Sequence, residues 1–418
     1  MNNSGSIVFL TILFAISLFL SWYSFQAFKT VLVEVAYDKF KVIYFIIYWL
    51  LYGVYITYVL LTFLSIFREG EISNKSQSIL NVLLTVTITQ ATILVIMLGE
   101  DLFRGIQAGI NFLGSSNPEE KSYFPERRKF ISQMALVLAA FPFLSFVYGI
   151  YKGKYNFKVL KETLYFDDLP PGFDGFTITQ ISDIHAGSFR DFSEVQKGID
   201  LAKAQNSDLF VFTGDLVNRT ADEIEPLLER FREIKAPYGQ YSILGNHDYG
   251  DYIQWDKPED KVKNFDSLKT QHTRMDYKLL LDQHVTLEKE GSKIQLLGVE
   301  NWGLGFKSKG NLDKALEGLN EKDFKILLSH DPTHWDEVVK NHPSKIQLTL
   351  SGHTHGMQFG IETPVFRWSP AKYRYPNWAG LAEKAGRFLY VNRGFGFHAF
   401  AGRVGIWPEI TVITLKTK

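Results

Sequence analysis

Four long apolar runs in the first 150 residues constrain the fold of this chain more than any other feature. They lie near Ile7–Ala27, Val42–Phe67, Ile79–Leu98 and Phe130–Ile150. Crossing the hydrocarbon core of a bilayer takes about 20 apolar residues, so each run is long enough to span it. A cleaved signal peptide would explain the first run alone, and buried core helices are seldom so long and uncharged. The sequence therefore predicts a four-helix transmembrane region over residues 1–150.

Basic residues between the runs indicate which side of the membrane the chain ends face. Four spans place both ends on one side, so the two loops opposite them can be compared with the same-side segments. The opposite loops hold Lys29, Lys39, Lys41, Arg104, Lys121, Arg127, Arg128 and Lys129, and the same-side segments hold Arg68, Lys75, Lys152, Lys154, Lys158 and Lys161. Since basic loops favour the cytoplasm, we expect a multi-pass protein of the cell (inner) membrane whose C-terminal region lies outside the cytoplasm.

The string Glu126-Arg127-Arg128-Lys129-Phe130-Ile131 before the fourth run has two interpretations. It resembles a twin-arginine export signal, which would agree with an exported C-terminal region. It is equally well a group of basic residues that marks the end of a membrane helix.

Composition excludes several classes of site and partner. The 45 basic and 45 acidic residues cancel, so no overall field indicates nucleic acid or a polyacidic partner. Cysteine is absent, which excludes disulfides, thiolate metal sites and cysteine nucleophiles. No obligate protein partner is inferred.

Short β-rich runs alternate with amphipathic helical patterns in the second part of the chain. Residues 151–172 are predicted as a linker with a first strand, and residues 173–418 as a mixed α/β domain. The predicted strands are Phe176–Ser182, Leu209–Thr213, Tyr241–Leu244, a hairpin over Val285–Val299, Lys325–Leu328, Ile346–Leu350, Phe388–Val391 and Ile410–Leu415. Helices are predicted over Phe192–Ala204 and Ile224–Ile234, and an inserted surface loop between Asp248 and Asp276.

Five short segments share one pattern, in which a buried strand is followed by a loop rich in Asp, Asn and His. They are Ser182-Asp183-Ile184-His185, Gly214-Asp215-Leu216-Val217-Asn218-Arg219, Gly245-Asn246-His247-Asp248, Ser329-His330-Asp331 and Gly352-His353-Thr354-His355-Gly356. The first three recur about every 30 residues, the length of a βαβ unit. Successive crossovers would deliver them to the carboxyl edge of one sheet, where ligands bind in open α/β sheets.

The residue types in these loops indicate a metal site. Positions i and i+2 of an extended segment share a face, so Asp183 can converge with His185, and His353 with His355. Carboxylate, amide oxygen and imidazole together suit Mn, Fe or Zn, whereas oxygen ligands alone would suit Mg or Ca. Two metals ~3.5–4 Å apart need a bridging carboxylate and can activate water while holding a phosphoryl group. Each segment alone is more often turn chemistry, but five in order favour a site.

These five segments resemble the calcineurin-like metallophosphoesterases, and the resemblance runs from Phe176 to the C-terminus. It implies a four-layer αββα sandwich with two divalent metal ions at the sheet edges. The implied ligands are Asp183, His185 and His355 for one metal and Asn246, His330 and His353 for the other, with Asp215 bridging. His247 would stabilise the transition state or protonate the leaving oxygen, while a hydroxide between the metals attacks phosphorus in line.

One position departs from part of this family. Phosphoprotein phosphatases show Gly-Asp-x-Val-Asp-Arg where this chain has Asn218 before Arg219. Because an amide oxygen accepts a hydrogen bond without supplying charge, Asn218 cannot stabilise an imidazolium as that second Asp does. The difference argues against a protein phosphatase. Arg219 either binds a substrate phosphate or is a solvated Arg at a helix entry.

The apolar runs, this domain and the ending Gly394–Trp407 before Pro408-Glu409-Ile410 resemble the membrane-linked branch of the family. Members act on UDP-2,3-diacylglucosamine in lipid A synthesis or as general phosphodiesterases. The resemblance implies a phosphodiesterase or pyrophosphatase for a membrane-proximal or lipid-linked substrate, although cytoplasmic lipid A chemistry conflicts with the outward topology. Aromatic residues that either hold acyl chains or pack a core are Trp368, Tyr373, Tyr375, Trp378, Phe395, Phe397 and Phe400.

Two other functions fit parts of the sequence. One is a catalytically inactive membrane receptor or scaffold with a metal-binding domain. Degenerate domains usually lose ligands, whereas all seven candidate metal positions here hold competent residues. The other is a four-helix transporter with a regulatory hydrolase, which the scarcity of ionisable residues in the apolar runs disfavours. Glu100, Asp101 and Arg104, just past the third run, are interpreted as interfacial charges.

Overall fold

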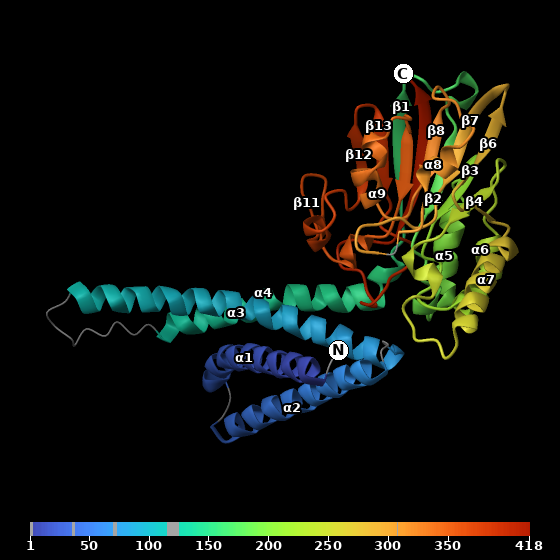
Figure 1. The fold of residues 1–418 in the computed structure, drawn as a ribbon. Coiled ribbons are helices and arrows are strands. Elements are labelled where there is room, and N and C mark those ends of the chain that lie inside the picture. The colour runs from blue at the N-terminus through green and yellow to red at the C-terminus, as the bar shows by residue number, and fades with distance from the viewer. Residues whose placement is uncertain (1–2, 36–37, 70–72, 115–124, 307) are drawn as a thin grey trace. The chain divides into compact units, whose positions relative to one another are not determined.

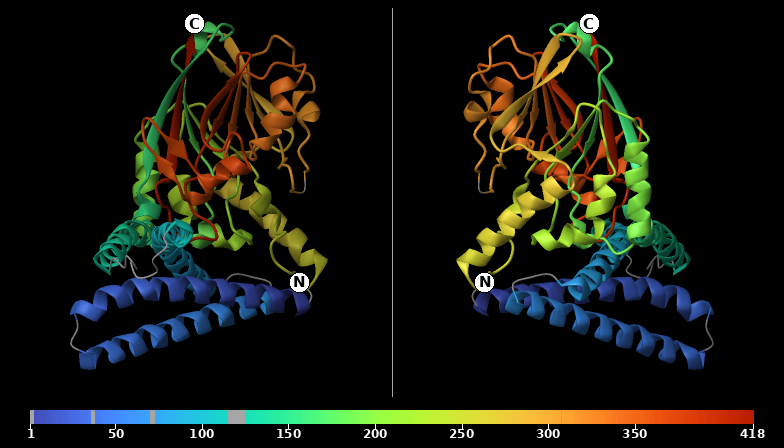
Figure 2. Two further views of the ribbon diagram at one scale, coloured as in Figure 1. Left: turned by 90° about the vertical axis from the view of Figure 1, so that its left-hand side faces the viewer. Right: turned by 90° about the vertical axis from the view of Figure 1, so that its right-hand side faces the viewer.

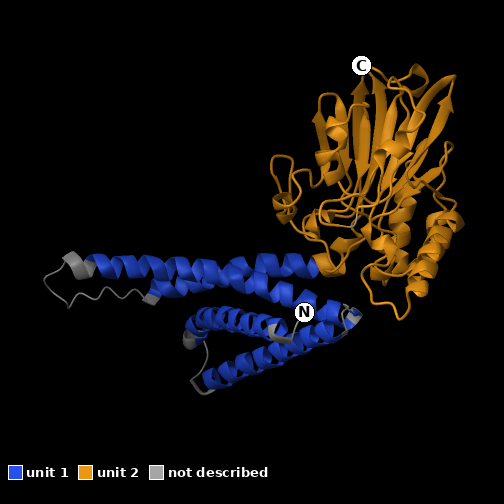
Figure 3. Cartoon of the chain, viewed as in Figure 1, with its two compact units in different colours: residues 1–148 blue, residues 149–418 orange. Residues whose placement is uncertain are grey.

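Four long helices make up the first unit of the chain, residues 1–148 (Figure 3). They are α1 (Asn3–Val35), α2 (Asp38–Glu69), α3 (Asn74–Gly114) and α4 (Pro125–Tyr151). All four are long and apolar enough to cross a membrane, over Gly5–Leu32, Phe40–Arg68, Lys75–Ile110 and Glu126–Tyr151. Each of these ranges contains one of the predicted apolar runs, so the prediction of four apolar N-terminal helices is confirmed.

The computed structural model describes most of the chain. The described residues are 3–35, 38–69, 73–114, 125–306 and 308–418. Lys121, one of the basic residues used for the predicted orientation, lies outside them.

Polarity in the four-helix unit is distributed as expected for helices in lipid. Large apolar side chains such as Leu51 and Val95 are exposed, whereas small polar ones such as Ser21 and Ser24 are buried. Gln90 of α3 donates to the Ser21 hydroxyl of α1 at 2.9 Å. Because lipid supplies no hydrophobic drive between helices, small residues and interhelical hydrogen bonds of this kind hold such units together.

Two acidic residues of α3 pair with the two arginines at the start of α4. Arg127 Nη2 lies 2.9 Å from Glu100 Oε2, and Arg128 pairs with Asp101. The hydroxyl of Tyr23 in α1 also donates to Asp101, at 2.7 Å. Both arginines of the predicted export-signal or helix-end string therefore contribute to the packing of α3 and α4.

The second unit, residues 149–418, contains two six-stranded sheets (Figures 1 and 2). In spatial order the first sheet is β1 (Lys158–Phe166), β14 (Glu409–Thr417), β2 (Thr177–Ile181), β3 (Leu209–Thr213), β4 (Gln240–Ile243) and β5 (Lys278–Leu279). The second sheet is β12 (Gly380–Lys384), β13 (Arg387–Val391), β9 (Leu348–Ser351), β8 (Lys325–Leu328), β7 (Ser292–Gly298) and β6 (Gln283–Lys289). A small hairpin pairs β10 (Ile361–Glu362) with β11 (Arg367–Trp368).

Three apolar cores show how the layers stack. Ile178 and Leu209 of the first sheet share one core with Ile326 and Leu350 of the second, so the sheets pack face to face. A core on the outer face of the first sheet includes residues of α5 (Phe192–Lys203), α6 (Leu228–Arg232) and α7 (Pro258–Arg274). A core on the outer face of the second sheet includes residues of α8 (Leu312–Leu316) and α9 (Thr333–Glu337). The predicted four-layer αββα sandwich is confirmed.

Parallel strands at the centre of each sheet deliver the five polar loops to one edge of the sandwich. β2, β3 and β4 are mutually parallel, as are β7, β8 and β9. Hydrogen bonds between neighbouring loops continue the ladders, from Asp183 N to Gly214 O and from Gly352 N to His330 O, both 2.9 Å. Gln180 also donates to Ser351 O at 2.9 Å, which joins the two sheets next to this edge.

Two local predictions differ from the structure. The predicted surface loop between Asp248 and Asp276 is wrong in its second half, which is α7; only Leu268, Gln271 and His272 of that helix are buried, too few to produce an apolar period. The predicted helix over Ile224–Ile234 is a 3₁₀ turn (Ala221–Leu227) followed by the short α6, because Pro226 interrupts it. The first strand predicted within residues 151–172 is present as β1, which pairs with β14 along its whole length.

Candidate metal centre

Strained backbone marks the loops at the shared sheet edge. Five of the seven predicted metal ligands have positive φ: Asp183 (52°), His185 (48°), Asp215 (59°), His353 (72°) and His355 (50°). Such conformations are uncommon outside glycine and persist only where the surroundings impose them, which happens most often at functional sites. The surrounding structure therefore keeps these loops in strained backbone conformations that orient the five side chains.

The first cluster consists of Asp183, His185 and His355, whose potential ligand atoms lie within 4.8 Å of one another. All three residues are buried. His355 Nε2 lies 3.3 Å from Asp183 Oδ1, and the rings of His185 and His355 have centroids 4.9 Å apart. The structure thus brings together the three residues that the family resemblance assigns to one metal.

The second cluster consists of Asp215, His330 and His353, also within 4.8 Å of one another. His330 Nε2 lies 3.2 Å from Asp215 Oδ2 and 3.3 Å from His353 Nδ1. Thr213 O accepts from His330 Nδ1 at 2.7 Å, and this bond leaves Nε2 facing the cluster. These three belong to the predicted second metal and its bridging carboxylate.

Asp215 connects the two clusters. Its Oδ2 lies 3.5 Å from His185 Nε2 as well as 3.2 Å from His330 Nε2. Its Oδ1 accepts from the backbone N–H of His247 at 2.8 Å. One carboxylate oxygen between two groups of ligands is the arrangement that a bridging role requires.

Burial and the neighbouring carboxylates together set the charge of these side chains. Desolvation raises the pKa of Asp183 to about 6 and lowers the pKa of His353 to about 4. Desolvation also lowers the pKa of His330, but the nearby Asp215 carboxylate overcomes this and raises it to about 10. The pKa values of His185 and His355 are depressed well below 6.5 by burial. A neutral imidazole keeps a lone pair that can bind a metal ion.

Several buried polar atoms in the described part of the chain make no hydrogen bond, and three of them belong to predicted ligands: His185 Nδ1, His355 Nε2 and Asn246 Oδ1. Buried polar atoms are nearly always paired, and an unpaired one needs an explanation such as a bound ion. Carboxylate, imidazole and amide oxygen together form a donor set for Mn, Fe or Zn. The residues present therefore fit a divalent metal ion.

Asp248 organises the loops around Asp215. Its carboxylate accepts from the backbone N–H groups of Gly245 and Asp215 at 2.9 Å, and from that of Leu216 at 2.9 Å. A Cβ on Gly245 would lie 2.2 Å from Asp215 Oδ1, so only glycine fits at that position. Burial raises the pKa of Asp248 to about 7.

His247 is held by a different part of Asn218 than the sequence suggested. Its Nδ1 lies 2.8 Å from the backbone carbonyl of Asn218, which can only accept, so Nδ1 carries the proton and Nε2 is left available. The side chain of Asn218 instead contacts Ser188 Oγ at 3.0 Å and His398 Nδ1 at 3.1 Å. Asn218 therefore positions two histidines at once.

Arg219 lies beside these histidines. Its Nε is 3.8 Å from Glu223 Oε1, and its side chain is about one-third exposed. Its charge contributes, after burial and the neighbouring His247, to lowering the pKa of His398 to about 4. Arg219 is thus partly exposed and close to the centre, a position compatible with both predicted interpretations.

His398 was missed by the sequence reasoning. Its ring stacks on that of His185 at 4.8 Å and lies 4.5 Å from that of His247. The potential ligand atoms of these three histidines also lie within 4.8 Å of one another. His398 does not belong to one of the five polar loops that directly follow a predicted strand. Its only signal in the sequence was that it is a histidine within the segment Gly394–Trp407.

Two further residues near the clusters were missed as site residues. The Tyr375 hydroxyl lies 2.9 Å from His353 Nε2, and Arg403 Nη2 lies 3.2 Å from His355 Nδ1. Arg403 is completely buried and donates to the backbone carbonyls of Arg393, Gly394 and Gly396. It therefore fixes the loop that lies against the first cluster.

Most of the downstream aromatic residues pack cores rather than form an open surface. Phe395 and Phe397 belong to the core behind the first sheet, and Tyr375 and Trp378 to a small separate core. Tyr373 is exposed. Trp368 and Phe400 are half-buried. Acyl-chain contacts by this whole set are therefore not supported.

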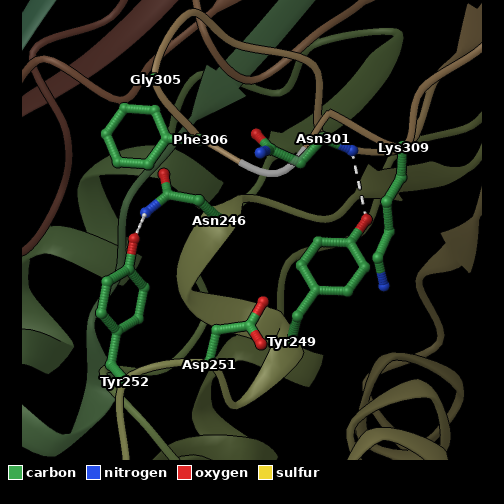
Figure 4. Close-up of a pocket in the computed structure, with 8 residues that line it drawn as sticks. All are labelled: Asn246, Tyr249, Asp251, Tyr252, Asn301, Gly305, Phe306 and Lys309. Atoms are coloured by element: carbon green, nitrogen blue, oxygen red, sulfur yellow. Dashed lines mark hydrogen bonds between the residues drawn. The ribbon is translucent and has the colours of Figure 1, made fainter.

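A pocket of about 190 Å³ opens beside Asn246 (Figure 4). Asn246 Nδ2 donates to the Tyr252 hydroxyl at 2.7 Å, and its Oδ1 points away from that tyrosine. Phe306 lies on the same wall and has its ring centroid 4.8 Å from that of His353. Asn301, only 2% exposed, lines the pocket, and its Oδ1 has no hydrogen-bond partner among the described residues. The pocket therefore lies beside the second cluster and offers polar and aromatic contacts.

Comparisons with known proteins agree with this architecture. Residues 5–154 match the family described as a probable calcineurin-like phosphoesterase transmembrane domain, and residues 176–357 match the family described as calcineurin-like phosphoesterase. The uncharacterized metallophosphoesterase YkuE of Bacillus subtilis is 31% identical over 300 residues, which cover 70% of this chain and 98% of that protein. A transmembrane protein with metallophosphoesterase domain from Danio rerio is 28% identical over 294 residues, 68% of this chain and 62% of that protein.

In this chain the apolar helices precede a two-sheet domain whose sheet edges carry the Asp and His clusters. The predicted resemblance to the membrane-linked branch rests on the apolar helices together with the phosphoesterase domain. This chain therefore belongs to the calcineurin-like metallophosphoesterase family, as a multi-pass membrane protein.

Proposed function

We propose that this protein is a membrane-anchored phosphoester hydrolase that uses two divalent metal ions. The observation that carries the proposal is the position of Asp215 Oδ2, which lies 3.2 Å from His330 Nε2 and 3.5 Å from His185 Nε2. It places one carboxylate oxygen between two clusters of metal ligands. The alternative, a catalytically inactive receptor or scaffold with a metal-binding domain, could also hold metal ions, and the activity measurement below separates the two.

The proposed ligands follow the two clusters. Asp183, His185 and His355 would hold one ion, and Asn246, His330 and His353 the other, with Asp215 shared. Asn246 joins the second set because its buried Oδ1 has no hydrogen-bond partner and its neighbour His247 donates its backbone N–H to Asp215. Bound Mn, Fe or Zn would supply an activated water and neutralise charge on the phosphoryl group.

His247 is the proposed catalytic side chain. Because its Nδ1–H is committed to the Asn218 carbonyl, its Nε2 is free to take up a proton, and in that protonated form it would donate to a phosphoryl oxygen or pass the proton to the leaving oxygen. Stacking against Tyr252, at 4.2 Å between ring centroids, holds the imidazole plane. A backbone carbonyl orients the ring without adding a formal charge, which supports a phosphodiesterase or pyrophosphatase rather than a protein phosphatase. In this proposal Arg219 and His398 would contact further oxygens of the substrate.

The proposed substrate is a membrane-proximal or lipid-linked phosphoester, of which UDP-2,3-diacylglucosamine is one candidate. Support comes from the four apolar helices, which keep the domain next to a bilayer. The distribution of basic loops supports a domain outside the cytoplasm at the inner membrane. If the substrate is a cytoplasmic lipid A precursor, the catalytic domain cannot lie outside the cytoplasm. A reporter enzyme fused to the C-terminus separates them, because a cytoplasmic signal overturns the orientation.

The first experiment measures hydrolysis of bis-p-nitrophenyl phosphate by the purified full-length protein with Mn²⁺. We expect activity that a chelator removes and added Mn²⁺ restores. Asp215→Ala and His247→Ala should both be inactive, whereas His342→Ala, which changes a histidine paired with Asp313, should keep full activity. Chelator-insensitive turnover, or full turnover in His247→Ala, would contradict the mechanism. Incubation with UDP-2,3-diacylglucosamine and a phospholipid panel, followed by mass spectrometry, then identifies the substrate class.

A further inference from the structure

A small hairpin next to the metal centre presents large apolar side chains to solvent. It is formed by β10 and β11 and follows the Gly352–Gly356 loop after only a few residues. Ile361 is 52% exposed, Val365 at its tip 96% and Phe366 55%. We call these three side chains the apolar tip. Tips of tight turns normally carry Gly, Pro, Asn, Asp or Ser, and exposed apolar groups gathered at one place usually mark an interaction surface.

The hairpin is held in this shape by its own hydrogen bonds. Thr363 N donates to Phe366 O at 2.9 Å, and Phe366 N donates to Thr363 Oγ1 at 3.0 Å, which closes the turn. At its base, Glu362 is paired with Arg393, which itself pairs with the buried Glu409. The apolar tip is therefore fixed outward by a turn that is anchored in the domain.

Exposed basic residues lie beside the apolar tip in the sequence. Arg367 belongs to β11, and Lys372 and Arg374 follow in the next turn. The single acidic residue of the stretch 359–376, Glu362, is already paired with Arg393. Apolar side chains accompanied by Lys and Arg are the combination that binds an anionic bilayer surface, since apolar groups enter the interface while the cations meet lipid phosphates.

A bilayer is within reach of the domain because the chain is continuous. The last membrane helix, α4, ends at Tyr151, and β1 begins at Lys158. Residues 152–157 between them span at most about 20 Å even when fully extended. The short connection therefore keeps a bilayer near the domain, whereas any soluble partner would have to be recruited.

We propose that the apolar tip, with Arg367, Lys372 and Arg374, docks on the anionic surface of the bilayer in which the protein is embedded. Ser369, just after β11, donates to Gly356 O at 2.6 Å, so the hairpin is also tied to the loop that carries His353 and His355. Docking would turn this loop toward lipid headgroups. The proposal does not depend on catalysis and would stand for an inactive domain as well.

The absence of cysteine from the sequence makes a direct test possible. Val365→Cys is introduced into the full-length protein, labelled with the fluorophore NBD and reconstituted in nanodiscs of phosphatidylcholine with phosphatidylglycerol. Glu290→Cys is the matched control, because Glu290 lies in the β6–β7 turn and its side chain is 74% exposed. We expect a blue-shifted emission at position 365 that doxyl-labelled lipid largely quenches, and water-like, unquenched emission at position 290.

A second label position tests whether the apolar side chains and the anionic lipid are each needed for docking. With NBD at Ile361→Cys, the substitution Phe366→Glu should remove most of the quenching, and so should phosphatidylcholine discs without anionic lipid. Equal emission and equal quenching at positions 365 and 290 would overturn the proposal. So would a disulfide-linked dimer through Val365→Cys without lipid quenching, because it would assign the surface to a second copy of the chain.

Discussion

The two ligand clusters of the metal centre differ in what surrounds them. The first, Asp183 with His185 and His355, is closed by the 394–403 loop, where Arg403 contacts His355 at 3.2 Å. The backbone there is pressed against the cluster, since a Cβ on Gly394 would lie 3.0 Å from both Asp183 Cβ and His355 Nδ1. This cluster is part of the interior of the domain.

The second cluster, Asp215 with His330 and His353, borders the pocket beside Asn246. His353 faces Phe306 and Tyr375, and Phe306 is a wall of the pocket in Figure 4. We infer that the two clusters have different roles. The packing of the domain holds the first cluster, whereas the pocket beside the second cluster binds the organic group of the substrate. Changes near the first should therefore act on stability and metal retention, and changes near the second on substrate affinity.

The largest effect should come from the residue that both clusters share. Asp215→Ala removes the carboxylate from each, and we expect loss of both metals together with a fall in turnover of roughly 10³–10⁶-fold. Metal content by mass spectrometry and turnover of bis-p-nitrophenyl phosphate measure the two effects. Retention of one full equivalent of metal would show that the clusters are independent.

The next effect should leave both clusters intact. His247→Ala removes the proposed proton-transferring side chain, so turnover should fall by about 10²–10⁴-fold while metal content stays unchanged. A parallel loss of metal would instead make His247 a ligand, as its position in the group with His185 and His398 allows.

Arg403→Met and Phe306→Ala contrast the surroundings of the two clusters directly. Arg403→Met leaves buried carbonyls without a donor, at a cost of about 1–3 kcal/mol for each, so the melting temperature and metal retention should fall. Phe306→Ala should keep both and raise KM with little change in kcat. If the two variants behaved alike, the contrast between the two clusters would be lost.

Replacing the group that aligns the histidines should have a smaller effect. Asn218→Leu removes the side-chain contact to His398 but keeps the backbone carbonyl that holds His247. Outer partners of this kind are usually worth about 10–100-fold, and we expect the lower end of that range in kcat/KM. His398→Gln should match it, and the double variant should be no worse than either single one.

A buried histidine that belongs to neither cluster should show the smallest effect. Burial lowers the pKa of His272 to about 3, so the folded protein keeps it neutral while the unfolded chain protonates it below pH 6.5. Its contribution to stability is therefore complete above pH 6.5 and is lost as pH falls from 6.5 toward 3, by about 1.4 kcal/mol per unit. Urea unfolding of wild type and His272→Gln at pH 7.5 and 5.5 should differ in slope with pH; equal slopes would contradict the assignment.

Strong local patterns allowed most of the architecture to be predicted. The four apolar runs define membrane helices by length and composition alone, and the loops after β2, β3, β4, β8 and β9 follow short buried strands. The candidate ligands lie in those loops, where Asp, Asn and His beside glycine are visible in the sequence. α7 was missed because only three of its residues are buried, and β10–β11 because two-residue strands have no period.

By itself, the sequence determined the four apolar helices, the mixed α/β character of the second domain and the candidate ligands, because each of these follows from the residues of short stretches of chain. Only the tertiary structure decided which side chains meet. Asn218 contacts His398 across 180 residues of sequence, and Gln180 joins strands of different sheets across 171. Such contacts depend on how two sheets pack face to face, a geometry that no local period encodes. The same packing places the 394–403 loop against one ligand cluster and the pocket beside the other.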